Sequence, residues 1–222
     1  MLTHAKRKLL LELSAPLLMD ALHSLGLPER ILDSAIRPIV PFSRMAGTAV
    51  TALIRSQPDP AKASLSAYAE LLKSGAGVCA PVMAVQVPRE HHNRGIFGEG
   101  SVTMGRHCGL AGALIEGAAR DTHALRQMEF PVFSRAVAAA YICHKVEVQN
   151  TGSPVSIGGL TIDQGQIIFG DNDGVLVIHP AELDAVLKRA LEIKAWEQET
   201  LSSLAQGLSL DETIKRSGPM PG

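Results

Sequence analysis

A short apolar run between two glycine-containing loops constrains the fold of this chain most. No polar side chain interrupts Ala113–Ile115, as expected of a strand covered on both faces, and Gly117 is predicted to end that strand. Asp121 then stands at the N-cap of a helix predicted over 121–128, and Val132-Phe133 follows as the next strand. Strand, helix and strand in this order predict parallel strands joined by a right-handed crossover. The chain is therefore predicted to be an α/β protein.

Two loops beside this unit carry the predicted chemistry. Arg120 and Asp121 directly follow the first strand, at the carboxyl end where open α/β sheets bind ligands. The glycine-rich segment 98–101 precedes a short helix that closes at Gly109, a predicted left-handed C-cap residue. The free N–H groups at the start of that helix are suited to an anion. Together the two loops would suit a small carboxylic acid and a divalent metal ion.

The carboxylates near these loops allow more than one role. Asp121 is either a helix N-cap or a metal ligand, and both interpretations stay open at this point. Glu99 and Glu116 are two further carboxylates predicted near the same place. Because magnesium usually takes one or two protein carboxylates and keeps several waters, these two are expected outside the direct ligand set, where they would steer a metal-bound water.

Further strands are predicted from β-branched and apolar runs. The segment 45–54 is a strand candidate, and Pro81 in the mostly apolar stretch 78–87 predicts either a bulge or a strand that begins after it. Proline-rich 36–41 predicts an edge or a connector, and a helix is predicted over 61–74. The stretches 166–170 and 175–178 flank Asp171-Asn172-Asp173-Gly174, which predicts a hairpin turn; the aspartates suggest calcium, but the EF-hand spacing is absent.

The two ends of the chain are predicted to be helical. Residues 1–30 should form N-terminal helices, the second of them capped by Ser14. A long helix is predicted from Pro180 to Gln206 and is a candidate arm for packing on a neighbouring subunit. Residues 207–222 are expected to be frayed, and 1–222 to form a single domain.

Composition excludes several classes of function. The formal net charge is −1 and aromatic residues make up 4%, so nothing favours a nucleic-acid or membrane surface. No stretch reaches the roughly 18 apolar residues of a membrane span. Glu12 interrupts the apolar run after Lys6-Arg7, which argues against a signal peptide. Three cysteines without a CxxC pair are typical of free, buried thiols, so we expect a cytoplasmic protein.

Two other motifs have weaker chemical meaning. Gly100–Gly105 has the glycine spacing of a phosphate loop, but Arg106-His107 stand where lysine and a hydroxyl residue belong, which disfavours nucleotide binding. The pair His91-His92 suggests a metal, yet adjacent side chains on an extended segment point in opposite directions. A solvated loop is the preferred interpretation there.

At these residues the chain resembles a known family. Gly98-Glu99, the run Gly109–Asp121 and the stretch Phe130–Phe133 look like the class II 4-hydroxy-4-methyl-2-oxoglutarate aldolase and RraA-like family. The likeness continues in three further stretches, Met19–Leu22, Ala46–Thr51 and Gly170–Val175, in the family's order and spacing.

The resemblance implies a structure and an activity. The expected fold is a compact RraA-like α/β domain of the swivelling β/β/α type, with central sheets flanked by helices and a C-terminal helical arm, assembled as a trimer or hexamer with intersubunit sites. Arg120 would bind the carboxylate of a pyruvate-like unit, and Asp121 would ligate Mg²⁺ or Mn²⁺. The amides of Gly98, Glu99, Gly100 and Ser101 would hold the same 2-oxo acid, and Glu197 would reach a neighbour's site.

The implied reaction is retro-aldol cleavage of a 4-hydroxy-2-oxo acid to pyruvate, through an enolate that a divalent metal stabilises without a lysine Schiff base. Glu99 would serve with Arg120 and Asp121 as a catalytic group, and oxaloacetate decarboxylation would accompany cleavage. Two alternatives remain: a non-catalytic, RraA-like regulator that binds a ribonuclease, and a lyase for a bulkier sugar-derived 2-oxo acid. Gly100-Ser101 replaces a bulkier pair usual in the family, and Gln86 stands where an aspartate is common, so both positions bear on the substrate range.

Overall fold

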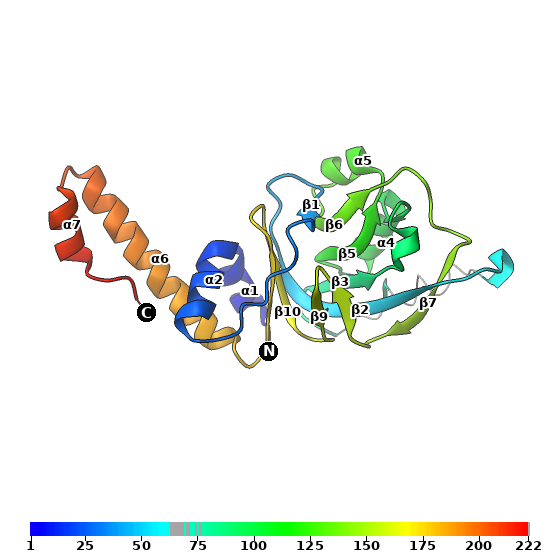
Figure 1. Cartoon of the computed structure of the whole chain (residues 1–222), viewed down its shortest axis with the longest axis horizontal. Helices are drawn as coiled ribbons and strands as arrows, with labels where there is room; N and C mark the ends of the chain where they lie inside the picture. The colour runs from blue at the N-terminus through cyan, green and yellow to red at the C-terminus, as the bar shows by residue number, and fades with distance from the viewer. Residues whose placement is uncertain (63–68, 70–71, 74, 76, 222) are drawn as a thin grey trace.

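Parallel strands form the centre of the molecule. The computed structural model describes residues 1–62, 69, 72–73, 75 and 77–221 (Figure 1). Four parallel strands lie side by side in the order β6-β5-β3-β2: β2 (Met45–Ser56), β3 (Pro81–Gln86), β5 (Gly112–Ala119) and β6 (Val132–Val137). Helix α5 (Thr122–Gln127) connects β5 to β6. The predicted α/β class is confirmed, as are the strands predicted at 45–54 and next to Pro81.

Strand β5 is longer than its sequence predicts. It continues past Gly117 to Ala119, so the prediction that this glycine ends the strand is wrong. The register between β5 and β6 shifts between Ile115 and Ala118, which marks a bulge at the glycine. A Cβ at Gly117 would lie 3.1 Å from Val87, so the bulge brings the backbone close to the end of β3. After the bulge, β5 continues to Ala119 and is followed directly by Arg120.

Antiparallel strands extend the sheet on both sides. Strand β1 (Arg37–Pro38) pairs with β6 at one edge, as the proline-rich segment predicts. On the other side β10 (Ile167–Gly170) pairs with β2, and it forms the predicted hairpin with β11 (Val175–Ile178). Strand β7 (Val146–Thr151) pairs with the far end of β2, and β8 (Val155–Ile157) and β9 (Leu160–Ile162) form a separate hairpin.

The hairpin turn uses its aspartate as a structural acceptor. Asp171 is buried, and its two carboxylate oxygens accept hydrogen bonds from the backbone N–H groups of Ala15 (2.8 Å) and Asp173 (2.9 Å). These bonds fix the turn and join it to the start of an N-terminal helix. The predicted turn is confirmed, and this carboxylate is engaged within the fold.

The sheet separates two apolar clusters because successive side chains of a strand point to opposite faces. On one face Ala113 and Ile115 pack with Val102 of α4 (Glu99–His107) and Leu125 of α5. On the other face Leu114 packs with residues of the β8–β9 hairpin.

The segments Pro60–Lys62 and Arg89–His91 form short 3₁₀ turns. The helix predicted over 61–74 lies largely outside the described residues.

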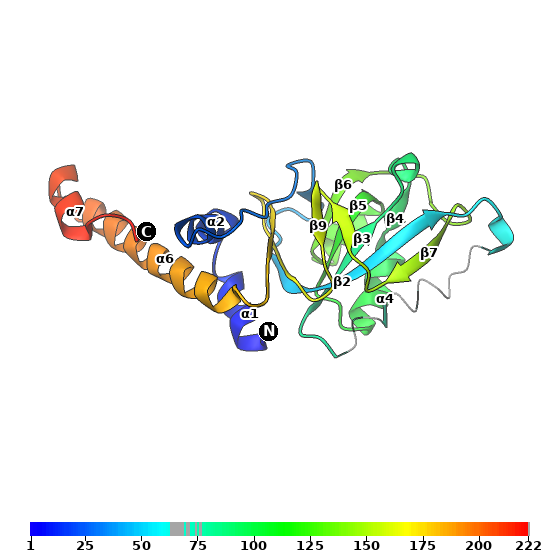
Figure 2. The same cartoon turned by 60° about the horizontal axis from the view of Figure 1, so that its bottom comes forward.

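A third cluster joins the two ends of the chain. Helices α1 (His4–Leu11) and α2 (Ala15–Ser24) pack with α6 (Leu183–Ala205) against β10 and β11. The predicted cap is confirmed, since Ser14 Oγ accepts a hydrogen bond from Leu17 N–H (3.4 Å). In Figures 1 and 2, α6 extends away from the sheet as an arm. Within the described residues no helix is both long and apolar enough to cross a membrane.

The C-terminal end corrects two predictions. Helix α6 begins at Leu183 rather than Pro180, because residues 180–182 form a turn in which Glu182 N–H donates to His179 C=O (2.9 Å). The expectation that 207–222 is frayed is wrong: Leu210–Ser217 forms helix α7. Ser209 and Glu212 form a reciprocal capping box at its start, and the indole N–H of Trp196 donates to Gly218 C=O (3.2 Å).

Candidate functional site

A short strand absent from the sequence prediction brings the two predicted loops together. Strand β4 (Gly95–Phe97) runs parallel to β5, and Gly95 and Phe97 pair with Ala118 and Ala119. Two parallel strands end at the same edge of a sheet, so the residues that follow them are neighbours. Gly98 follows β4, and Arg120 follows β5. The expectation that these loops meet is confirmed.

Arg120 and Asp121 form an ion pair at this edge. Arg120 Nε donates to Asp121 Oδ1 (3.1 Å), and the guanidinium lies over the ring of Tyr141, 5.0 Å from its centroid. The backbone N–H of Arg120 donates to Phe97 C=O (2.9 Å), which fixes the start of the loop. Both side chains are about one-third exposed, 30% and 35%, so they remain accessible to a ligand.

Asp121 occupies the predicted N-cap position without acting as a side-chain cap. Its backbone is left-handed, with φ 53°, and its side chain makes no capping hydrogen bond to α5. The carboxylate instead accepts through Oδ2 from the backbone N–H of Glu99 (3.2 Å), at the start of α4. The helix-cap interpretation of this side chain is therefore wrong, because the left-handed backbone directs it toward the other loop.

Glycines make room for this pair. A Cβ on Gly95 would lie 2.6 Å from Arg120 Cβ, and a Cβ on Gly98 would overlap Asp121 Oδ2. The backbone of Gly98 has φ −150°, which any residue can adopt. Close approach, and not backbone conformation, therefore requires glycine at position 98.

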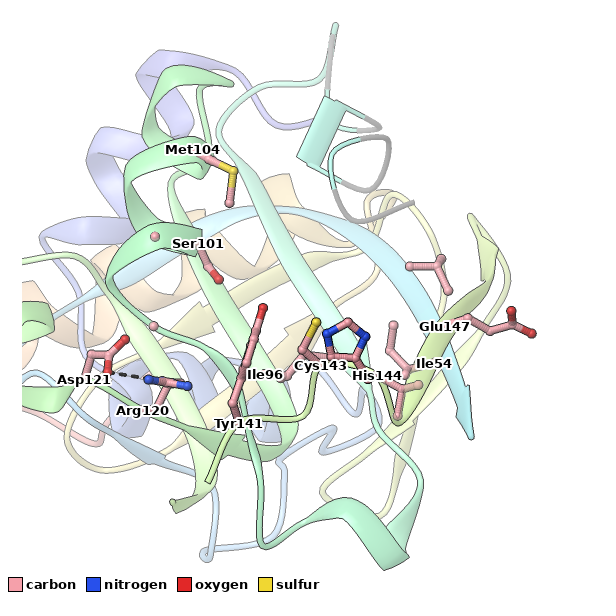
Figure 3. A pocket seen from close by; sticks show the side chains of 14 residues that line it. Ile54, Ile96, Ser101, Met104, Arg120, Asp121, Tyr141, Cys143, His144 and Glu147 are labelled. Atoms are coloured by element: carbon pink, nitrogen blue, oxygen red, sulfur yellow. Dashed lines mark hydrogen bonds and ion pairs between the residues drawn. The ribbon is translucent and has the colours of Figure 1, made fainter. Parts of the chain in front are cut away.

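A cavity of about 330 Å³ opens beside the ion pair (Figure 3). Arg120 and Asp121 line it together with Gly98, Gly100 and Ser101, from the start of α4. The first N–H groups of a helix have no partner within that helix and favour negative charge. One end of the cavity thus offers a guanidinium and backbone N–H groups to an anion, beside one carboxylate.

This donor set suits a hard divalent cation. Asp121 accepts two hydrogen bonds, whereas an ionised carboxylate has about four acceptor positions. Mg²⁺ is commonly held by one or two carboxylates with waters and substrate oxygens. Among the described residues no group of three or more His, Cys, Asp or Glu side chains is placed to hold a metal. The set is therefore compatible with Mg²⁺ or Mn²⁺ and lacks the side chains of a typical zinc site.

The other predicted carboxylates do not line this cavity. Glu99 is exposed and contributes its backbone N–H to Asp121. Glu197 lies on the α6 arm and, within this chain, is not part of the cavity wall. Its predicted role at a neighbour's site stays a prediction.

Glu116 lies at a second cavity, which corrects its placement. It shares the sheet face of Leu114, two residues earlier, so it points away from the cluster of Ala113 and Ile115. Its carboxylate pairs with Arg135 and accepts from Gly158 N–H (2.7 Å), which joins β5, β6 and the β8–β9 turn. The pairing also raises the pKa of Arg135.

Several residues of the main cavity were not predicted from the sequence. Tyr141, Cys143 and His144 come from the connection between β6 and β7. Partial burial raises the pKa of the Tyr141 hydroxyl, and its hydrogen bond with Cys143 adds to this shift. The connection has no apolar period or motif that would have placed it here. The remaining lining residues are mainly apolar: Ile54, Ile96, Met104, Val146 and Val148, with Glu147 between the last two.

The remaining candidate motifs have structural partners. The ring nitrogen Nε2 of His91 lies 3.0 Å from Ser56 Oγ, and that of His92 lies 3.0 Å from Val87 C=O. The two rings therefore contact different groups. Cys79, Cys108 and Cys143 are free, as predicted, and each is partly buried rather than fully buried.

Comparisons with known proteins agree with this architecture. The sequence model of a family described as "RraA-like: Aldolase/RraA" matches residues 15–177. An uncharacterized protein from Pseudomonas syringae pv. tomato superposes with a TM-score of 0.77 at 21% identity, covering 96% of this chain and 98% of the other. Streptomyces coelicolor RraAS2, described as an unusual member of the RNase ES inhibitor RraA protein family, superposes with a TM-score of 0.76 at 21% identity, covering 92% and 100%. These structures establish the fold.

Sequence relatives match over shorter segments. A Halalkalibacterium halodurans protein named "Putative 4-hydroxy-4-methyl-2-oxoglutarate aldolase" is 36% identical over 102 residues, which cover 46% of this chain and 48% of that protein. Protein DlpA of Legionella pneumophila is 34% identical over 106 residues, covering 46% of this chain and 17% of DlpA. The chain thus spans about half or less of the length of these relatives.

Proposed function

The chain belongs to the RraA-like (Aldolase/RraA) family, and on that premise we propose that it is a divalent-metal-dependent lyase. Its proposed reaction is the cleavage of a 4-hydroxy-2-oxo acid to pyruvate and a carbonyl compound, with decarboxylation of oxaloacetate as a companion activity. The observation that carries the proposal is the shared cavity of Arg120, Asp121 and the start of α4. The name of the Halalkalibacterium halodurans relative supports the same class of reaction.

Each group at this end of the cavity has a proposed role. Arg120 and the N–H groups of Gly100 and Ser101 bind the carboxylate of the 2-oxo acid. Asp121 holds Mg²⁺ or Mn²⁺, and its bonds to Arg120 and to the backbone of Glu99 keep its carboxylate oriented. The metal, when bound, supplies a Lewis acid beside the 2-oxo group.

The bond changes follow from this placement. The 4-hydroxyl loses its proton, the C3–C4 bond breaks, and its electron pair passes to the pyruvate half as an enolate, which is then protonated at C3. We assign the proton transfer to a water molecule, and we propose that Glu99, exposed just outside the cavity wall between Gly98 and Gly100, orients that water. Glu197 of a neighbouring subunit is proposed as a second carboxylate that orients this water.

The test measures enzyme-dependent pyruvate release from oxaloacetate and from 4-hydroxy-4-methyl-2-oxoglutarate, with Mg²⁺ and with a chelator. Release by the wild type should require the metal, and Asp121→Asn should reduce it by on the order of 100-fold or more while the melting temperature stays close to that of the wild type. Asparagine tolerates the left-handed backbone at this position, so the variant isolates the loss of charge. Absence of metal-dependent release by folded protein from both substrates would exclude the lyase and favour the ribonuclease-binding alternative.

A further inference from the structure

The cavity has two chemically different ends. Figure 3 shows Arg120 and Asp121 at one end and Ile54 at the other, with Tyr141 and Cys143 between them. If the charged end binds the pyruvate half of a substrate, as proposed above, the far end faces the group attached to C4. The side chains there therefore bear on which substrate the site accepts.

Three apolar side chains form the far end, and we call them the tail wall: Ile54, Val146 and Val148. Ile96 lies between the two ends (Figure 3). Ile54 on β2 is paired in register with Val148 on β7, and Ser56 with Val146. Because residues two apart share a face of a strand, the two valines point the same way. Ile54 belongs to the buried cluster that includes residues of α4 and α5, and the two partly buried valines pack against this cluster.

The charges around the tail wall do not favour a second carboxylate. Among the described residues that line the cavity, Arg120 is the one arginine or lysine. His144, beside Ile54 in Figure 3, adds an imidazole whose Nδ1 lies 3.4 Å from Pro60 C=O. Glu147, between the two valines, points its carboxylate away from the cavity (Figure 3), and hydrogen bonds from Gln57 and Arg55 lower its pKa. Arg55 is thereby engaged, and Lys62, which also acts on Glu147, pairs with Asp59 at 3.4 Å.

We infer that the tail wall selects substrates whose C4 substituent is uncharged and mainly hydrocarbon. The corresponding class is the aldol adducts of pyruvate with short aliphatic aldehydes or ketones. A second carboxylate would lose its water against apolar side chains without gaining an arginine or lysine partner among the described lining residues, which is unfavourable. A polyhydroxylated tail would lose hydrogen bonds to water in the same way. This inference rests on the proposed lyase function and narrows its substrate class.

The experiment compares kcat/KM, by pyruvate release with Mg²⁺, across tails of different chemistry. The uncharged probes are 4-hydroxy-2-oxopentanoate, 4-hydroxy-2-oxohexanoate and 4-hydroxy-2-oxoheptanoate. The charged probe is 4-hydroxy-4-methyl-2-oxoglutarate, and 2-oxo-3-deoxygluconate is the polyhydroxylated one. We expect kcat/KM to rise by about fourfold for each added methylene that is buried. The charged and polyhydroxylated probes should be at least about tenfold poorer than the hexanoate.

A substitution in the tail wall tests its role directly. Val148→Arg adds a cation on strand β7, which pairs with β2 alone among the described strands and can accept a longer side chain. This variant should raise the ratio of kcat/KM for the dicarboxylate to that for the hexanoate by about tenfold or more. Val148→Leu keeps the wall apolar and should leave the order of preference unchanged. Thermal melting verifies that both variants are folded.

A second readout separates failure of this inference from failure of the proposed function. Exchange of the pyruvate methyl protons for deuterium in D₂O, followed by NMR with Mg²⁺, needs only the charged end of the cavity. Metal-dependent exchange together with a preference for the dicarboxylate or the polyhydroxylated acid would overturn the inference and leave the lyase function standing. Absence of both exchange and cleavage would overturn both.

Discussion

At the scale of single residues, the left-handed backbone of Asp121 determines where its carboxylate points. A non-glycine residue with positive φ costs free energy, so the surrounding bonds must hold it in place. Those bonds are the ones its carboxylate makes to Arg120 and to the backbone of Glu99. The same contacts that hold the strained backbone also aim the carboxylate into the cavity. Asp121 therefore links the loop after β5 to the loop before α4.

Gly98→Ala should disable the site without unfolding the protein. The new Cβ would overlap Asp121 Oδ2 and lie 2.8 Å from Arg120 Cγ, so both side chains must move. We expect oxaloacetate decarboxylation to fall by on the order of 100-fold, because small displacements of reacting groups are costly. The comparison is Gly100→Ala, whose Cβ would meet nothing within 4 Å and should cause a much smaller loss. Equal losses in the two variants would contradict this account.

At the scale of elements, the boundaries of the terminal helices depend on side-chain contacts. The start of α6 is shifted by Glu182, whose carboxylate accepts two hydrogen bonds from Arg30 (2.7 and 3.0 Å) and one from His179 N–H (3.3 Å). The start of α7 depends on the capping box of Ser209 and Glu212. Each contact supports a prediction about stability.

Glu182→Gln should destabilise the protein in a pH-dependent way. Arg30 lowers the pKa of Glu182 below its ordinary value of 4.5, so the stabilisation is complete above that value and is lost as the pH falls through the lowered pKa. At pH 7 we expect urea unfolding to show a loss of about 1–2 kcal/mol. The difference from the wild type should shrink below about pH 4.5. Glu192→Gln, an exposed carboxylate on the same helix, is the control, and a gap that is equal at pH 7 and pH 3 would refute the assignment.

Ser209→Ala should fray α7. The loss of an N-cap hydroxyl costs about 1 kcal/mol, and this helix is only eight residues long. Trp196 is the single tryptophan, and its indole contacts Gly218 just after α7, so its emission should shift to longer wavelength. Ser209→Thr retains the hydroxyl and should keep the wild-type spectrum. An unshifted spectrum for the alanine variant would show that α7 does not depend on the box.

Sequence patterns predicted the elements that form from local periodicity. The parallel unit around β5, the hairpin at Asp171 and the cap at Ser14 all have local signals. Strand β4 has three residues, too few for a periodic pattern, and the bulge at Gly117 resembles a strand end in sequence. The spacing of Ser209 and Glu212 is that of a capping box and is visible in the sequence, but the glycine and proline content around it favoured the prediction of fraying.

The candidate site was predictable only where the chain order forces proximity. Arg120 and Asp121 were predicted at the carboxyl end of β5 and the loop 98–101 at the start of a helix, whereas the pairing of β4 with β5 that brings them together was not predicted. The tail wall depends on the register of β7 against β2 and on the path of the connection that carries Tyr141. Such long-range pairing leaves no mark in a single sequence. The opposite orientation of Glu116 follows from strand alternation, but only once the register is known.

At the scale of the whole molecule, the α6–α7 arm extends away from the sheet (Figure 2). Leu201 and Leu204, three residues apart on α6, are 66% and 41% exposed. Exposed apolar groups that are neighbours on a helix face are typical of an interaction surface. This arrangement is compatible with the trimer or hexamer that the family resemblance implies.

We propose that this face contributes to self-association, so replacing both leucines by lysine should weaken it. Charges on this face would lose their hydration in any contact between copies, so the mass measured by light scattering should fall toward that of a 23.6 kDa monomer. Lys188→Ala, a change at an exposed position of the same arm, should leave the mass unaltered. An unchanged mass in the double variant would place the contact elsewhere.

The division of the cavity between central and edge strands has an evolutionary consequence. Arg120 and Asp121, at its charged end, follow β5, which lies between β3 and β6 in the sheet, whereas Val146 and Val148 belong to β7, which pairs only with β2 among the described strands. Mutations on such an edge can accumulate without disturbing the hydrogen bonds of the central strands. A lineage with this architecture can therefore acquire new substrates while it inherits the reaction unchanged.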